Sequence, residues 1–341
     1  MTAPDKAQKP PATASTARWL LRFGAGLLLV GLLVKHNSGA QLMAVLRSAS
    51  GFVLLGSVVL YWAGQVLSAA KWQLLLRAQG ASLSLFECCR LYLVGMFCNL
   101  WLPTNIGGDA VRAVLAAPKC GGAAIAVSSI FVERITGFLA LLLIGVVALL
   151  ADLLSPRKGY MAKGNMAMSP FMIIIQAMVV ALLFAALFWM SRRAAKRLSH
   201  KAPHNNLARK WAALHRALDE YGSRDRLGVL ATSMLLSLVF QASQVVLNLV
   251  LARAVGLQLP PLVMWWLVPV LALASLVPLG IGGLGVREVA AIKLLSASGI
   301  SAETVLAWSL LWQATVWLAS LPGALWWKSR SDARVLANKP E

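Results

Sequence analysis

The chain has 341 residues, of which 59% are hydrophobic and 13% are charged. In soluble domains roughly a quarter of the residues are charged, so this composition excludes an ordinary water-soluble enzyme and favours an all-α, polytopic membrane protein. A formal net charge of +20 would suggest a nucleic-acid partner in a soluble protein. We expect none here, because the position of the charges along the chain matters more than their sum.

In chain order, residues 1–16 form a tail that we expect to be disordered and cytoplasmic. A membrane domain over 17–327 follows, and 328–341 form a second cytoplasmic tail. A helix needs about 20 apolar residues to cross a bilayer. The stretches that reach this length are 17–34, 51–70, 123–151, 170–190, 228–251 and 302–327. Two further apolar segments, 83–102 and 262–279, end in Pro and Gly clusters and are predicted to be re-entrant or broken helices.

The loop 192–226 carries ten Lys and Arg residues against three acids, which marks it as cytoplasmic. With both termini on the same side, 21 basic residues fall in cytoplasmic stretches, Lys71 among them, and six fall outside. Apolar residues at helical spacing within the loop predict an amphipathic helix: Leu207, Trp211, Leu214, Leu218 and Tyr221. This helix would lie either on anionic lipid headgroups or on the protein's own cytoplasmic face.

An internal repeat is the most informative feature of the sequence. Residues 103–112 read Pro-Thr-Asn-Ile-Gly-Gly-Asp-Ala-Val-Arg, and residues 278–287 read Pro-Leu-Gly-Ile-Gly-Gly-Leu-Gly-Val-Arg, with six identities at a spacing of 175. The repeat halves cover about 17–151 and 170–327. Each half holds three crossings and one interrupted segment, so the second half would enter from the opposite face. Inverted repeats with matching helix breaks are typical of transporters whose substrate site lies at the repeat interface.

Charged residues near the membrane interior point to an anionic ligand. The group has four bases and three acids, and each is expensive to bury unless it faces water or a partner: Asp109, Arg112, Glu133, Arg134, Arg287, Glu288 and Lys293. The Gly-Gly turns add backbone amides that favour anions. We therefore expect Arg112, Arg134 and Arg287 to bind substrate together with Asn105, Gly107, Gly108, Gly282 and Gly283.

Within the same group, Asp109, Glu133 and Glu288 would form the charge network that orients the arginines, and Pro103 and Pro278 would be hinges. Local pairs of Asp109 with Arg112 and of Arg287 with Glu288 are feasible. Glu133 and Arg134 point about 100° apart on a helix, so they should serve different partners. The alternative is an ion-pair lock that fixes the broken helices without touching substrate.

Other chemistry is not expected. The run from Gly280 to Gly285 matches a dinucleotide-binding pattern, but no strand precedes it, so we predict no nucleotide cofactor. Cys88, Cys89, Cys98 and Cys120 lack metal-ligand spacing, so we predict no metal. No Walker loop or hydrolase motif occurs, and we expect no catalytic residues and no enzymatic activity.

Three motifs in order carry a family resemblance: Pro103 to Arg112, the Glu133-Arg134 pair, and Pro278 to Glu288. Over roughly 18–327 the chain resembles the flippase-like family named for the transmembrane region of lysylphosphatidylglycerol synthase. The resemblance implies a bacterial inner (plasma) membrane protein that moves anionic or modified lipids between leaflets. Only 14 residues follow Trp327, so we expect a free-standing member without the soluble synthase domain.

Three functions follow as hypotheses. The first is a lipid transporter that works by rocking of inverted repeats about a central polar cavity, with anionic membrane lipids as partners. The second is a non-transporting scaffold or regulator of a lipid-modifying enzyme, acting through the basic loop 192–226. The third is transfer from a lipid-linked donor with Asp109 or Glu133 as base. The sequence does not specify the lipid, the energy source or the oligomeric state.

Overall fold

The computed structural model describes residues 43–44, 46–47, 50–100, 107–154, 206–275, 285–296 and 299–327. All regular secondary structure in this part of the chain is helical, which confirms the all-α prediction. The predicted spans 17–34 and 170–190 lie outside the described residues. So do both tails and residues 192–205 of the basic loop.

In the described ranges, four helices are long and apolar enough to cross a membrane. They are α3 (Gly51–Ala78), α6 (Ala123–Leu153), α9 (Leu227–Ala254), and α12 (Ala302–Ser320) with its continuation α13 (Gly323–Trp327). At 1.5 Å per residue α3 is about 42 Å long, more than the roughly 30 Å of a hydrocarbon core. Ser50 and Ser301 cap the starts of α3 and α12 through their hydroxyl oxygens. These helices confirm the four predicted spans that the structure describes.

Both interrupted segments begin as short helices. Helix α4 (Leu85–Asn99) follows the N-cap Ser84, and α10 (Pro261–Ala274) begins at a proline. Each is only about 22 Å long, too short to cross. Beyond the breaks come α5 (Gly107–Ala116) with the 3-10 turn η1 (Ala117–Lys119), and α11 (Val286–Ser296). The breaks themselves, with Pro103, Asn105, Pro278, Gly282 and Gly283, lie outside the described residues.

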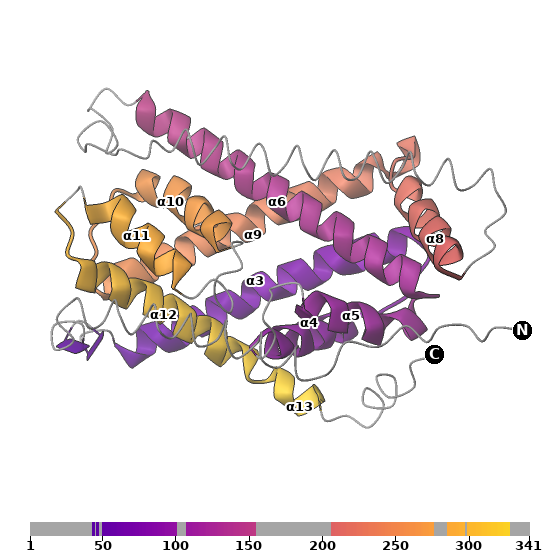
Figure 1. The fold of residues 1–341 in the computed structure, drawn as a ribbon, viewed down its shortest axis with the longest axis horizontal. Helices are drawn as coiled ribbons and strands as arrows, with labels where there is room; N and C mark the ends of the chain where they lie inside the picture. The colour runs from indigo at the N-terminus through magenta and orange to yellow at the C-terminus, as the bar shows by residue number, and fades with distance from the viewer. Residues whose placement is uncertain are drawn as a thin grey trace, which may run out of the picture.

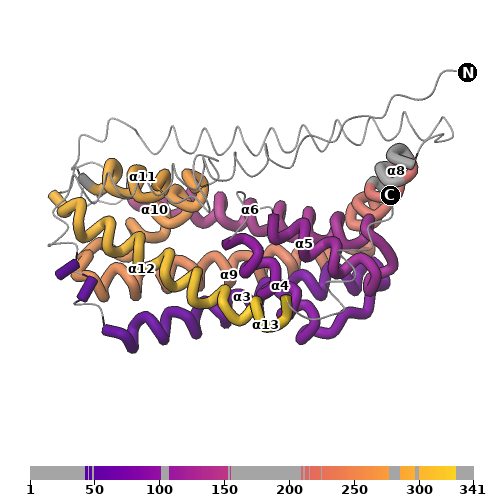
Figure 2. Tube along the Cα trace, turned by 60° about the horizontal axis from the view of Figure 1, so that its bottom comes forward, coloured from indigo at the N-terminus to yellow at the C-terminus, as the bar shows by residue number. Residues whose placement is uncertain are grey.

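Helices in the two halves correspond at the spacing of the sequence repeat. Adding 175 to the bounds of α3 and α4 gives 226–253 and 260–274, and the observed α9 and α10 occupy 227–254 and 261–274. In Figure 1, α3 runs from left to right and α9 from right to left, and α6 and α12 are opposed in the same way. Figures 1 and 2 both place α4 and α5 toward one end of the long axis and α10 and α11 toward the other.

Close backbone contacts hold the short helices in place. A Cβ on Gly95 of α4 would lie 3.0 Å from the carbonyl oxygen of Gly108 in α5, and a Cβ on Gly323 of α13 would meet the backbone of Leu93. A Cβ on Gly145 of α6 would lie 3.1 Å from Pro269 of α10. The contact faces are therefore glycine-lined, and the helices approach more closely than larger residues would permit.

The part of the basic loop that is described forms α8 (Asn206–Glu220), followed by the 3-10 turn η2 (Arg224–Arg226). Ala217 and Tyr221 are buried. The Tyr221 hydroxyl donates to the Leu75 carbonyl at 2.8 Å, and the Gln79 side-chain amide donates to the Ala217 carbonyl at 2.6 Å. Of the two placements expected for this helix, the structure shows packing on the protein itself. The side chains of Leu207 and Trp211 are outside the described set.

Candidate functional site

Arg112 is the centre of a buried cluster in the first half. Helix α5 carries it inward, where its side chain is 2% exposed and its guanidinium lies 2.5 Å from the Glu133 carboxylate of α6. The guanidinium carbon also lies 4.0 Å from the ring centroid of Tyr92 and 4.5 Å from that of Trp72. Two aromatic faces and a carboxylate are strong partners for a buried guanidinium. This geometry is that of the ion-pair lock considered from the sequence.

Glu133 and its neighbour Arg134 serve different partners, as predicted. Glu133 also accepts a hydrogen bond from the Tyr92 hydroxyl. Arg134 donates two hydrogen bonds to Asp109, at 2.6 and 2.7 Å. The Arg134 side chain is 58% exposed, against 12% for Asp109. Asp109 lies 3.8 Å from Arg112, so the expected local pair is present as a weaker contact.

Lys71 belongs to the same cluster as Arg112. This membership was not predicted from the sequence. The sequence places it in a cytoplasmic stretch just beyond a span ending at 70. In the structure α3 continues to Ala78, and Lys71 is 3% exposed. Its ammonium group donates to the Glu133 carbonyl at 3.1 Å and to the Ser237 hydroxyl at 3.0 Å. The charge-bias rule places basic residues on a side of the membrane but does not tell an interfacial lysine from a buried one.

Arg287 occupies a second cluster, built by α9, α11 and α12. It is 8% exposed and donates to the side-chain oxygen of Asn248 at 3.0 Å. Its guanidinium carbon lies 4.8 Å from the Trp312 ring and 5.7 Å from the Trp308 ring. The Trp308 indole donates to the Asn248 carbonyl at 3.2 Å, which fixes both partners. Arg287 therefore has an amide as its direct side-chain partner, whereas Arg112 has a carboxylate.

Glu288 does not pair directly with Arg287. Its two carboxylate oxygens accept hydrogen bonds from the Gly285 backbone at 2.6 Å and from the Ser309 hydroxyl at 2.7 Å. Gly285 has a φ of 90°, and its amide opens α11. A carboxylate at that position satisfies an unpaired amide and favours the positive end of the helix. Glu288 thus secures the helix that carries Arg287.

The predicted site residues fall into two groups. The structure brings together Asp109 and Arg112 of α5 with Glu133 and Arg134 of α6. Gly107 and Gly108 lie at the start of α5. The Gly108 amide donates to the Asn99 side chain at 2.6 Å. Arg287 and Glu288 belong to α11, which Figures 1 and 2 show near one end of the long axis and well away from α5. The described part thus contains two clusters and not one shared site.

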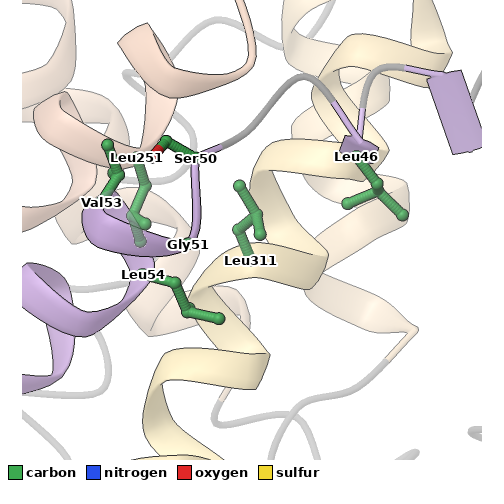
Figure 3. Close-up of a pocket in the computed structure, with 7 residues that line it drawn as sticks. All are labelled: Leu46, Ser50, Gly51, Val53, Leu54, Leu251 and Leu311. Atoms are coloured by element: carbon green, nitrogen blue, oxygen red, sulfur yellow. The ribbon is translucent and has the colours of Figure 1, made fainter.

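A small cavity lies at the start of α3. It has a volume of about 120 Å³ and is lined by the start of α3 with Leu251 of α9 and Leu311 of α12. Figure 3 shows mainly leucine and valine side chains around it, with Ser50 at one side. No charged residue lines it, so this cavity suits hydrocarbon and not a headgroup.

The two carboxylates of the first cluster are both held by arginine side chains. Among the residues with described positions, no group of three or more His, Cys, Asp or Glu side chains could hold a metal. Asp109 and Glu133, the two carboxylates considered as bases, both accept hydrogen bonds from arginine.

Comparison with known proteins decides the family. The family model described as the lysylphosphatidylglycerol synthase TM region matches residues 19–323, which include both arginine clusters. The chain belongs to this family. Membership of the lysylphosphatidylglycerol synthase TM region family agrees with the four membrane-length helices and identifies a multi-pass membrane protein connected with lipid metabolism. No curated protein and no solved structure matched the chain.

Proposed function

We propose that the protein binds an anionic lipid by its headgroup and moves it between the leaflets of a bacterial inner membrane. The observation that carries this proposal is the position of Arg134. Its side chain is 58% exposed, although it lies about 17 Å along α6 from the start of that helix. A charge at such depth costs roughly 2.5 to 3.5 kcal/mol unless it meets water or a partner. Asp109 neutralises one face of the guanidinium, and a lipid phosphate would suit the face left exposed.

Arg287 is the second group that we assign to the headgroup. Its direct side-chain partner, Asn248, is neutral. Its Nε, like that of Arg112, is buried without a hydrogen-bond partner among the described residues. Glu288 lies within electrostatic range of Arg287, but its two oxygens accept hydrogen bonds from Gly285 and Ser309. A phosphate could therefore accept from the guanidinium donor that is left without a partner. Arg112 has the Glu133 carboxylate instead, so we assign it a positioning role in the first cluster.

The opposed directions of the paired helices support a transport mechanism. Helices α3 and α9, and α6 and α12, correspond at the repeat spacing and run in opposite directions. We infer six spans arranged as inverted repeats, with both termini cytoplasmic and one interrupted segment entering from each face. Rocking of the halves would then expose the Arg134 and Arg287 ends to opposite leaflets in turn.

Reconstituted vesicles test the proposal. Arg134→Ala and Arg287→Ala should each slow the movement of fluorescent phosphatidylglycerol at least tenfold, because each removes one phosphate partner. The matched control is Arg77→Ala, which removes an exposed arginine at the end of α3 and should leave the rate unchanged. Unchanged rates in both test variants would reject the assignment. Binding of the lipid without movement by the wild-type protein would favour the scaffold hypothesis.

A further inference from the structure

Lys71 is a buried lysine whose hydrogen-bond partners among the described residues are neutral. It is 3% exposed and joins three membrane-length helices, since it extends from α3 to the Glu133 carbonyl of α6 and to the Ser237 hydroxyl of α9. A Cβ on Gly137 would lie 3.6 Å from its Nζ. The absence of a side chain at this position makes room for the lysine. Of the described residues, no carboxylate forms an ion pair with Lys71.

The charged side chains around Lys71 form ion pairs with one another, and neither pair includes Lys71. Its ammonium group lies within electrostatic range of Glu133, Arg134 and Arg112. Arg112 pairs with Glu133, and Arg134 pairs with Asp109. Helix α4 contributes the Tyr92 hydroxyl, which donates to Glu133, and α9 contributes the neutral Ser237. The two ion pairs are balanced without Lys71, so a protonated Lys71 gives this cluster a surplus charge of one.

A surplus charge in a low-dielectric interior can be neutralised in two ways. The lysine can lose its proton, because burial disfavours the ammonium form, or an anion can enter and neutralise it. A lipid phosphate bound at the exposed Arg134 would supply that anion in the same cluster. Headgroup binding and protonation of Lys71 then favour each other, and thermodynamic linkage makes the effect equal in both directions.

We propose that Lys71 takes up a proton when an anionic headgroup binds at Arg134, so that lipid binding, and with it lipid movement, is coupled to protons. This inference rests on the proposed function. A proton from water adds to the Nζ lone pair and converts the amine to an ammonium ion, while the phosphate supplies the compensating negative charge. Lipid affinity should therefore fall as pH rises, by up to about tenfold per pH unit while one proton is taken up for each lipid bound.

Proton uptake can be measured directly on the purified full-length protein. In weakly buffered neutral detergent with a pH indicator, short-chain phosphatidylglycerol should cause uptake approaching one proton for each lipid bound. Zwitterionic short-chain phosphatidylcholine should cause none. Lys71→Arg should bind phosphatidylglycerol without proton uptake and with little dependence on pH, because a guanidinium stays protonated. Lys71→Arg also retains a long side chain with hydrogen-bond donors, so it can still reach the Glu133 carbonyl and the Ser237 hydroxyl.

A second lysine supplies the control. Lys119→Met removes an amine outside the cluster, where it pairs with Glu87, and should leave the proton uptake unchanged. Uptake by Lys71→Arg equal to that of the wild type would overturn the inference, and so would wild-type binding without uptake. Both results would leave the proposed function intact. Failure of the wild-type protein to bind phosphatidylglycerol would overturn the proposed function and this inference together.

Discussion

The two arginine clusters lie in corresponding halves of the molecule, yet their charges are balanced differently. Arg112 lies 2.5 Å from a carboxylate, Glu133, whereas Arg287 lies 3.0 Å from an amide, Asn248. Both guanidinium groups also contact two aromatic rings. The same order of helices can therefore hold two buried arginines whose charges are balanced differently. In the proposed function, the neutralised Arg112 fixes the first half, and Arg287, whose direct side-chain partner is neutral, binds the lipid anion in the second half.

Replacing the first cluster's carboxylate by an amide should have the largest effect. Glu133→Gln leaves Arg112 buried without its counter-ion, and breaking a buried pair in this way costs about 3 to 5 kcal/mol. We expect a correspondingly lower thermal unfolding midpoint in detergent. Glu303→Gln is the matched control, because Glu303 lies in the first turn of α12, where an acid contributes about 1 kcal/mol or less. Equal losses in the two variants would contradict the lock.

Helix–helix contact also differs between the halves. Gly108 of α5 packs on Gly95 of α4, whereas the residue that corresponds to Gly95 in α10 is Val270. Gly108→Ala should destabilise the first half by about 1 to 3 kcal/mol, because the new methyl group meets backbone that cannot move aside easily. Chemical denaturation in detergent would measure the loss. Gly56→Ala, on a part of α3 with open space around it, should instead be neutral or slightly stabilising. A neutral Gly108→Ala would show that the α4–α5 contact is adjustable.

Much of the helical framework could be predicted from sequence, because apolar length and the position of prolines are local properties. The repeat of Pro103 to Arg112 also led to both arginines. Their different partners could not be predicted, since Trp72, Asn248 and Trp312 lie on helices far away in the chain and show no motif. The burial of Lys71 could not be predicted for a similar reason. Its burial depends on seven further residues of α3 and on a space beside Gly137 that only the packed structure reveals.

Giving Arg287 a carboxylate as its direct partner should weaken anion binding at the second cluster. Asn248→Asp would place an acid against Arg287, and we expect the affinity for phosphatidylglycerol to fall about tenfold, or about 1.4 kcal/mol. Asn248→Leu has a similar size but no charge, and it should not produce this loss, since it leaves the arginine positive. Calorimetric or fluorescence titration with short-chain lipid would compare the two. An equal reduction in both variants would mean that the amide acts through packing and not through charge.

The smallest effect concerns α8, which packs against helices of the first half. Tyr221→Phe removes the hydrogen bond to the Leu75 carbonyl and should cost about 1 kcal/mol.

Burial, with a smaller contribution from Glu220, raises the pKa of the Tyr221 hydroxyl above its ordinary value of about 10. The neutral hydroxyl is therefore favoured in the folded protein. The contribution of this neutral hydroxyl to the free energy of unfolding is complete below about pH 10 and is lost as pH rises toward the pKa of the folded state. Limited proteolysis between pH 8 and 11 should show α8 of the wild type becoming more accessible at the top of this range, while Tyr221→Phe changes less. Ser223→Ala, which removes a hydroxyl bonded only to the Glu220 carbonyl one turn away, should follow the wild type. A Tyr221→Phe profile identical to the wild type would show that the apolar contacts of Ala217, and not this hydroxyl, hold the helix in place.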